Sequence, residues 1–96
     1  MASFKVAHVR EQGVDLILVP LDRSFDYKST QEKSEVIDGL QTCATSAGLA
    51  GTVVPVWESS GGRMAFIAPR PWHPFLSSIS MRFVATNINR RLTCGP

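Results

Sequence analysis

The chain has 96 residues, of which 44% are hydrophobic and 19% are charged, and its formal net charge is +2. These values exclude a disordered tail, a coiled coil and a low-complexity chain, and they predict a single folded domain over residues 1–96. The longest apolar run, residues 16–21, is only six residues long, which is too short to cross a bilayer. Because the first residues lack the basic start and long apolar stretch of a signal peptide, the sequence predicts a soluble cytoplasmic domain.

Two strands joined by a tight turn are predicted at the start of the chain. Residues 4–10 alternate well enough for a half-buried strand. Gly13 supplies the backbone freedom that a short hairpin connection needs. Residues 14–21 are apolar on both faces, so this strand should be central and covered on both sides, either by helices or by another subunit.

A helix is predicted over residues 30–47, where the start and stop signals are clear. Ser29 and Glu32 have the spacing of a capping box. Apolar residues recur at spacings of three and four through the segment, which places them on one stripe. Gly48 is suited to the left-handed position that ends a helix, and Leu49 is the apolar residue that commonly folds back over such an end.

The second half of the chain is expected to repeat the same order. Residues 51–57 and 63–68 are predicted strands joined by a turn at residues 58–62. Pro55 has no amide hydrogen, so its strand should be an edge strand or contain a bulge.

The last segment carries an apolar stripe that predicts a helix over residues 75–92, with Pro74 in its first turn. Residues 79–83 also alternate as a strand would, so a strand remains the alternative there.

This order predicts an α+β fold, a two-layer sandwich with ββαββα order. A four-stranded antiparallel sheet would carry two helices on one face. The other face would then leave apolar side chains bare, and small sheets of that kind usually bury them by self-association. We therefore expect a homodimer.

The two cysteines, Cys43 and Cys94, are too few and too far apart in sequence to indicate a metal site or a disulfide framework. Cys43 falls on the apolar face of the predicted helix, where a thiol packs as a small hydrophobic group. Cys94 is expected to be exposed near the end of the chain.

Charge is divided unevenly along the sequence. Residues 1–58 contain five basic and eight acidic side chains, a balance of −3, whereas residues 59–96 contain five arginines and no acid, a balance of +5. Such a stretch is either a patch that meets phosphates or acidic partners, or a surface covered by the acidic half of the fold or of a second copy.

No phosphate-binding loop, zinc pattern or nucleophile elbow is present in the sequence. The glycine pair Gly61 and Gly62 is better explained as a hairpin turn than as an anion cradle. His8 could pair with Asp15 across the hairpin, or with Cys43, but no fixed spacing supports either pair as catalytic. We expect no cofactor, no metal and no enzymatic activity.

The most unusual segment is residues 70–75, where an arginine and three ring side chains are held by prolines. Rigid aromatic rings beside arginine are typical of binding hot spots. Arg70, Trp72, His73 and Phe75 are therefore our candidates for binding a ligand or partner. The favoured interpretation of Trp72 and Phe75 is nevertheless structural, because buried aromatic rings of this kind usually close the end of a small core.

Three stretches, residues 3–16, 47–57 and 62–69, resemble the small uncharacterised proteins encoded by mobile integron gene cassettes of bacteria. The segments at 72–75 and 87–90 fit the same resemblance, which would then extend over nearly the whole chain. It implies a bacterial origin on a mobile genetic element. It implies no activity, and no catalytic or binding residue is carried over from it.

The leading hypothesis is a non-enzymatic homodimeric module that binds a small ligand or a protein partner near Arg70, Trp72 and His73. The alternative is a nucleic-acid-binding protein in which the arginines of the second half contact phosphates and Trp72 or Phe75 stacks on bases. The arginines meant are Arg63, Arg82, Arg90 and Arg91. A small enzyme using His8 or His73 as acid or base is the least favoured of the three.

Overall fold

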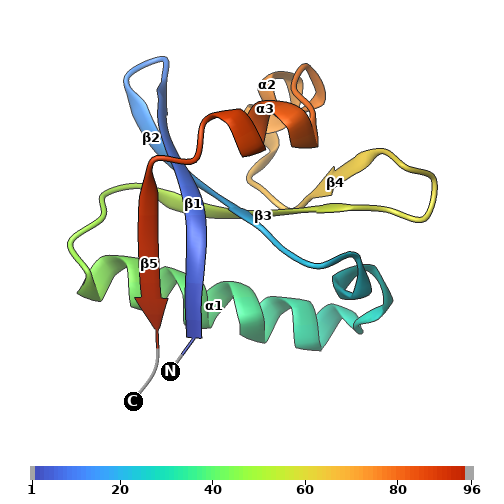
Figure 1. Ribbon diagram of the computed structural model, residues 1–96, viewed down its shortest axis with the longest axis horizontal. Coiled ribbons are helices and arrows are strands. Elements are labelled where there is room, and N and C mark those ends of the chain that lie inside the picture. The colour runs from blue at the N-terminus through green and yellow to red at the C-terminus, as the bar shows by residue number, and fades with distance from the viewer. Residues whose placement is uncertain (1, 95–96) are drawn as a thin grey trace.

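The computed structural model describes residues 2–94 and shows a five-stranded mixed sheet with helices on both faces (Figure 1). The strand order is β4-β3-β2-β1-β5. The elements are β1 (Ala2–Glu11), β2 (Val14–Pro20), η1 (Arg23–Tyr27), α1 (Thr30–Ser46), β3 (Thr52–Glu58), β4 (Met64–Phe66), η2 (Arg70–Trp72), α2 (His73–Ser77), α3 (Met81–Thr86) and β5 (Arg90–Cys94). Within residues 2–94, no helix has the length and apolar character needed to cross a lipid bilayer.

The first two strands form the predicted hairpin. Residues Ala7 to Glu11 of β1 pair antiparallel with β2, and the turn between the strands has positive φ at both Gln12 (52°) and Gly13 (77°). Positive φ at both turn positions gives the type of two-residue turn whose twist matches that of paired strands. The prediction of a tight connection at Gly13 is therefore confirmed.

The predicted helix is also confirmed, with both of its ends as expected. The Ser29 side chain accepts from the Glu32 N–H, and the Glu32 carboxylate accepts from the Ser29 N–H, so the capping box is complete. At the other end Gly48 has φ +80°, and Leu49 N–H donates to Ala44 C=O. This pattern of bonds closes the last turn and brings Leu49 against the core.

The sheet is mixed, and not antiparallel as predicted, because α1 connects β2 to β3. The helix returns the chain to the end of the sheet where β2 began, so β3 pairs parallel with β2 in the register Leu16–Thr52 to Pro20–Val56. The prediction of an antiparallel sheet was therefore wrong for the β2–β3 pair.

Pro55 lies on an interior strand, so its assignment to an edge was also wrong. The Ile67 N–H donates to the Pro55 carbonyl at 3.3 Å, which shows that Pro55 faces β4. Proline cannot return a hydrogen bond to that neighbour. The β3–β4 ladder accordingly ends one residue earlier, at the Val56–Phe66 pair, and β4 is only three residues long.

The last segment is two short helices and a fifth strand, where one helix over 75–92 was predicted. Asn87 is the C-cap of α3: its N–H makes the last helical bond to the Phe83 carbonyl at 3.1 Å, and its side-chain amide donates to the same oxygen at 2.7 Å. Residues Arg90 to Cys94 then pair with Ala2 to Val6. That half of β1 has no register with β2 in the described residues, so β5 supplies its partner. The ββαββα order is corrected to ββαββααβ.

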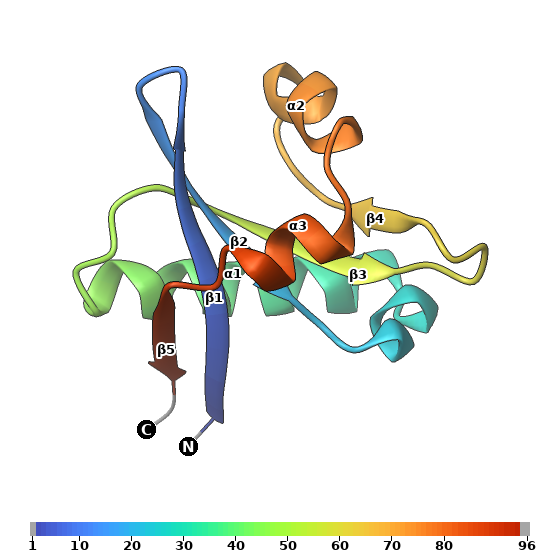
Figure 2. The same ribbon diagram turned by 45° about the horizontal axis from the view of Figure 1, so that its top comes forward.

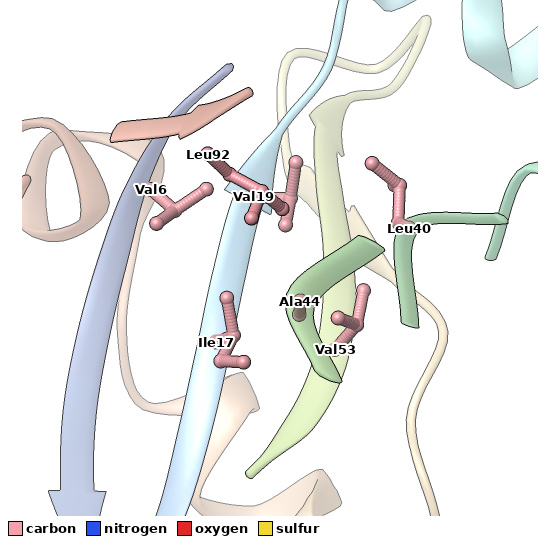
Figure 3. Packing of buried hydrophobic residues seen from close by; sticks show 7 residues of the cluster. All are labelled: Val6, Ile17, Val19, Leu40, Ala44, Val53 and Leu92. Carbon is pink, nitrogen blue, oxygen red and sulfur yellow. The ribbon is translucent and has the colours of Figure 1, made fainter. Parts of the chain in front are cut away.

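The core on the α1 side is built from four strands and the helix (Figure 3). Its buried members are apolar, and the two from β2, Ile17 and Val19, hold alternate positions, which point to one face of the sheet. They are Val6, Ile17, Val19, Leu40, Ala44, Val53 and Leu92.

A second core covers the opposite face of the sheet under α2 and α3. Figure 2 shows where these two helices lie. Its buried members are Ala7, Leu16, Leu18, Val54, Val56, Leu76 and Val84. The fold therefore has three layers, and the prediction of two helices on one face is corrected. The apolar character of both faces of β2 is explained within one chain.

Cys43 and Cys94 form a disulfide with a Cα–Cα distance of 5.6 Å. Cys43 does lie on the core-facing side of α1, but it is not a free thiol, and Cys94 is bonded and half-buried where we expected it to be exposed. The two cysteines are 51 positions apart in the sequence, and the pair was not predicted because β5 was assigned to a helix.

Candidate functional site

A cleft of about 650 Å³ opens between the β3–β4 hairpin and the segment that carries α2 and α3. Figure 2 shows α2, α3 and β4 together at the same end of the sheet. The cleft is lined by Glu58, Gly62, Arg63, Met64, Phe66, Leu76, Ser77, Ile79, Ser80, Met81 and Arg82. Two of these residues, Arg63 and Arg82, are among the arginines singled out from the sequence.

Arg63 is positioned by the hairpin turn between β3 and β4. Its carbonyl accepts from the Ser59 N–H at 2.8 Å and from the Ser59 hydroxyl at 2.9 Å. The Gly62 N–H also donates to the Ser59 carbonyl at 2.9 Å, and Gly62 has φ +79°. The predicted hairpin turn is confirmed, and its hydrogen bonds hold Arg63 at the mouth of the cleft.

Arg82 is positioned by the first turn of α3. Ser80 caps this helix, and its hydroxyl accepts from the Phe83 N–H at 3.4 Å. Val84, two residues after Arg82, is fully buried in the second core. The short helix is therefore anchored on one side while the exposed Arg82 lines the cleft on the other.

The charge at the cleft is positive because its one lining acid is already paired. The carboxylate of Glu58 lies 3.5 Å from the guanidinium of Arg23 on η1. Within residues 2–94, neither Arg63 nor Arg82 forms an ion pair. Two arginines thus face a solvent-filled cleft with no protein carboxylate of their own.

The remaining lining residues give the cleft an apolar floor. Met64 and Phe66 come from β4, Leu76 from α2, Ile79 from the link between α2 and α3, and Met81 from α3. Ser77 and Ser80 add hydroxyl groups. Methionine side chains adapt their shape to a ligand. Chemically, this arrangement accepts a molecule with an apolar body and an anionic group.

The segment singled out as a binding site has a different position. Trp72 and Phe75 are half-buried and pack against the second core, and the Phe75 and Phe83 rings meet edge-to-face with centroids 6.3 Å apart. His73 Nε2 lies 2.9 Å from the Ala68 carbonyl oxygen, and its ring is edge-on to Phe66 at 5.2 Å. Arg70 is exposed on η2. Trp72, His73 and Phe75 thus pack against the second core or its ring Phe66, and none of the four residues is among those that line the cleft.

Arg90 and Arg91 are not brought to the cleft either. Both are exposed on β5, where Arg91 lies directly opposite Lys5 of β1. Two cations opposite each other on paired strands are unfavourable to folding. Arg91 and Lys5 therefore bring two positive charges together at a place that does not line the cleft.

The catalytic pairs considered from the sequence are not formed. His8 lies opposite Ile17, and its Nε2 is 2.8 Å from the Ala50 carbonyl oxygen. Asp15 lies opposite Arg10, with 3.9 Å between carboxylate and guanidinium. Cys43 is bonded to Cys94, so it offers no free thiol to His8.

Comparison with family models, curated proteins and solved structures gives no match. The resemblance to integron-cassette proteins therefore stays a prediction, and function is inferred from the site alone.

Sequence reasoning missed Met64, Phe66, Ile79 and Met81 as lining residues, because their signal was only that of ordinary core positions. The uneven charge was the useful signal, since it led to Arg63 and Arg82 before any contact was known.

Proposed function

We propose that this protein is a non-enzymatic binding module whose ligand is a small molecule with an anionic group and an apolar body. The observation that carries the proposal is that Arg63 and Arg82 line one cleft together with an apolar floor. The guanidinium groups would hold a carboxylate or phosphate through charge-assisted hydrogen bonds. Met64, Phe66 and Met81 would cover the apolar part.

The same residues give the reason for proposing binding without catalysis. Among the described residues, neither histidine lines the cleft, and its one acid is paired with Arg23. A site with two cations and no free base is suited to holding an anion and not to moving protons.

The test uses three probes that share one apolar chain: octyl phosphate, octanoate and octanol. Binding is followed by the shifts of backbone amide signals in two-dimensional NMR. We expect the two anions to shift residues 62–66 and 76–82, and octanol to bind at least about tenfold more weakly. Arg63→Gln and Arg82→Gln should each weaken octyl phosphate binding about 5- to 10-fold.

The matched control is Arg70→Gln, which removes the same charge from an exposed arginine that does not line the cleft. Its affinity for octyl phosphate should equal that of the unchanged protein. Equal loss in all three variants would mean that net charge alone attracts the probe. Shifts confined to other residues would reject the cleft.

Nucleic acid is the second candidate ligand, and one observation favours it. The five arginines after residue 58 form no ion pair in the part of the chain that the structure describes, and Lys5 adds a sixth cation beside Arg91. Against this ligand, the rings meant to stack on bases, Trp72 and Phe75, pack against the core. Affinity for a single-stranded oligonucleotide that falls steeply with salt and with Arg90→Gln plus Arg91→Gln would favour this candidate.

The homodimer expected from the sequence stays a prediction and is not part of this proposal. It was inferred from a sheet with one bare face, and both faces are covered by helices. A protein partner would have to bind through the polar surface or the cleft. The cytoplasmic location also stays a prediction, and the Cys43–Cys94 bond argues against it, because disulfides are typical of oxidising compartments.

A further inference from the structure

The Cys43–Cys94 disulfide lies at the floor of an open groove between α1 and the end of β5. This cavity, of about 390 Å³, is lined by Gly39, Thr42, Cys43, Ser46, Ala47, Thr93 and Cys94. Among residues 2–94, no side chain that lines the groove is larger than threonine, and both cysteines are half-buried. A small molecule therefore reaches the disulfide while the protein is folded.

The disulfide also fastens a strand on which both ends of the described chain depend. Strand β5 is held by its pairing with residues Ala2 to Val6, by the burial of Leu92 and by the bond to α1. In the described part of the chain, residues Ala2 to Val6 have a register with β5 and with no other strand. Loosening β5 thus removes the ladder partner of the first half of β1.

We propose that Cys43–Cys94 is a thiol–disulfide exchange site for small peptide thiols, and that its reduction releases β5 from α1. A thiolate attacks one sulfur, the S–S bond breaks, and a mixed disulfide forms while the other cysteine leaves as a thiolate that takes a proton from water. A second thiol then attacks the mixed disulfide. In total, two thiols are oxidised to one disulfide, and the protein gains two cysteine thiols.

The groove accounts for the preference for small peptide thiols. Exchange requires the attacking sulfur to reach the disulfide directly, so accessible bonds react and covered ones do not. Thr42 and Ser46 of α1 line the groove, and their hydroxyls can bond to the amide and carboxylate groups of a short peptide. The groove shares no lining residue with the cleft of the proposed function, so the two proposals stand or fall separately.

The first experiment adds reduced glutathione to the oxidised, folded protein and follows the mixed disulfide and the reduced protein by intact mass after acid quenching. Thr42→Trp places a large side chain in the groove, whereas Thr45→Trp makes the same change at an exposed position of α1 outside it. We expect reduction of Thr42→Trp to be about tenfold slower than that of the unchanged protein, and Thr45→Trp to be unaffected. Equal rates in the two variants would overturn the proposal, as would a rate no faster than global unfolding, measured by exchange of the β3 amides.

The second experiment measures hydrogen exchange in the protein with both Cys43→Ser and Cys94→Ser. Exchange of residues 2–6 and 90–94 should be at least about tenfold faster than in the oxidised protein, relative to residues 52–58 of β3 in the same sample. An unchanged ratio would reject the release of β5. The glutathione experiment needs no cysteine variant, so the exchange site remains testable if this double variant does not fold.

Discussion

The side-chain amide of Asn89 pairs with both backbone polar groups of His8. Asn89 Oδ1 accepts from the His8 N–H at 2.8 Å, and Asn89 Nδ2 donates to the His8 carbonyl at 2.9 Å. The Asn89 side chain thus bonds to His8 as the backbone of a paired strand residue would, just before β5 begins its pairing with β1. Residues that are 81 positions apart are joined at the point where the chain returns to the sheet.

Asn89→Ala should lower the free energy of unfolding by about 1–2 kcal/mol, because it leaves two backbone groups of His8 to solvent or unpaired. Asn89→Asp should cost at least as much, since a carboxylate cannot donate to the His8 carbonyl. Urea denaturation measures both. Ser3→Ala, at an exposed position on the same strand, is the control and should change stability by less than about 0.5 kcal/mol. Asn89 variants with the stability of this control would contradict the pairing.

The segment around Asn89 is also where the prediction of a continuous helix was wrong. Ile88 and Leu92 are four positions apart, as on a helix, and that spacing favoured a continuous helix. The structure ends α3 at Thr86 and uses Asn87 and Asn89 for bonds to backbone groups. Side chains that compete for backbone hydrogen bonds favour helix ends. The pairing of β1 with β5 joins distant parts of the chain, so no local pattern of residues predicts it.

The features that were predicted correctly depend on neighbours within a few residues. The capping box at Ser29, the helix end at Gly48 and the turn at Gly13 are each complete within about six residues. The Cys43–Cys94 bond and the cleft depend on contacts between distant segments. Arg63 and Arg82 could be named from the charge pattern, but their place in one cleft with Phe66 could not.

Gly51→Ala should destabilise the protein severely, because Gly51 has φ +123° and a Cβ there would lie 2.5 Å from the Asp15 carbonyl oxygen. Backbone strain and overlap with β2 should together lower the free energy of unfolding by about 3 kcal/mol or more. Thermal and urea denaturation measure the loss.

Gly39→Ala is the matched comparison, because Gly39 lies inside α1 and a Cβ there would meet open space. It should raise stability by about 0.5–1 kcal/mol, the usual gain from replacing glycine within a helix. A similar effect of both substitutions would show that Gly51 does not approach Asp15 closely.

Acidification should weaken the start of α1. The Ser29 N–H donates to the Glu32 carboxylate, and this backbone bond, followed by the Ser29 side chain, holds the pKa of Glu32 below its usual value. A folded-state pKa below the unfolded one gives stability that is present above the unfolded pKa and is lost as pH falls through the folded pKa. The stability difference between the unchanged protein and Glu32→Gln should therefore be largest near neutral pH and should shrink below about pH 4.

Urea denaturation at a series of pH values measures this difference. Glu35→Gln removes the same charge three residues further along α1. The Glu35 carboxylate accepts from the Gln31 side chain and not from Ser29. This variant controls for the change in net charge. A Glu32→Gln difference that is constant from neutral pH to about pH 3 would show that the cap does not depend on the ionised carboxylate.

A protein whose sheet is covered on both faces should be a monomer at moderate concentration. Among residues 2–94, the large hydrophobic side chains that stay exposed are Val14, Tyr27 and Ile67, and they come from separate parts of the fold. Scattered exposed residues of this kind do not form the apolar patch that a stable dimer needs. Light scattering on a sizing column should therefore give a mass near 10.5 kDa at both 50 and 500 mM salt. A mass twice as large at high salt would restore the homodimer expected from the sequence. It would direct attention to the outer edge of β5, which has no strand partner in the described part of the chain and could pair with a second copy.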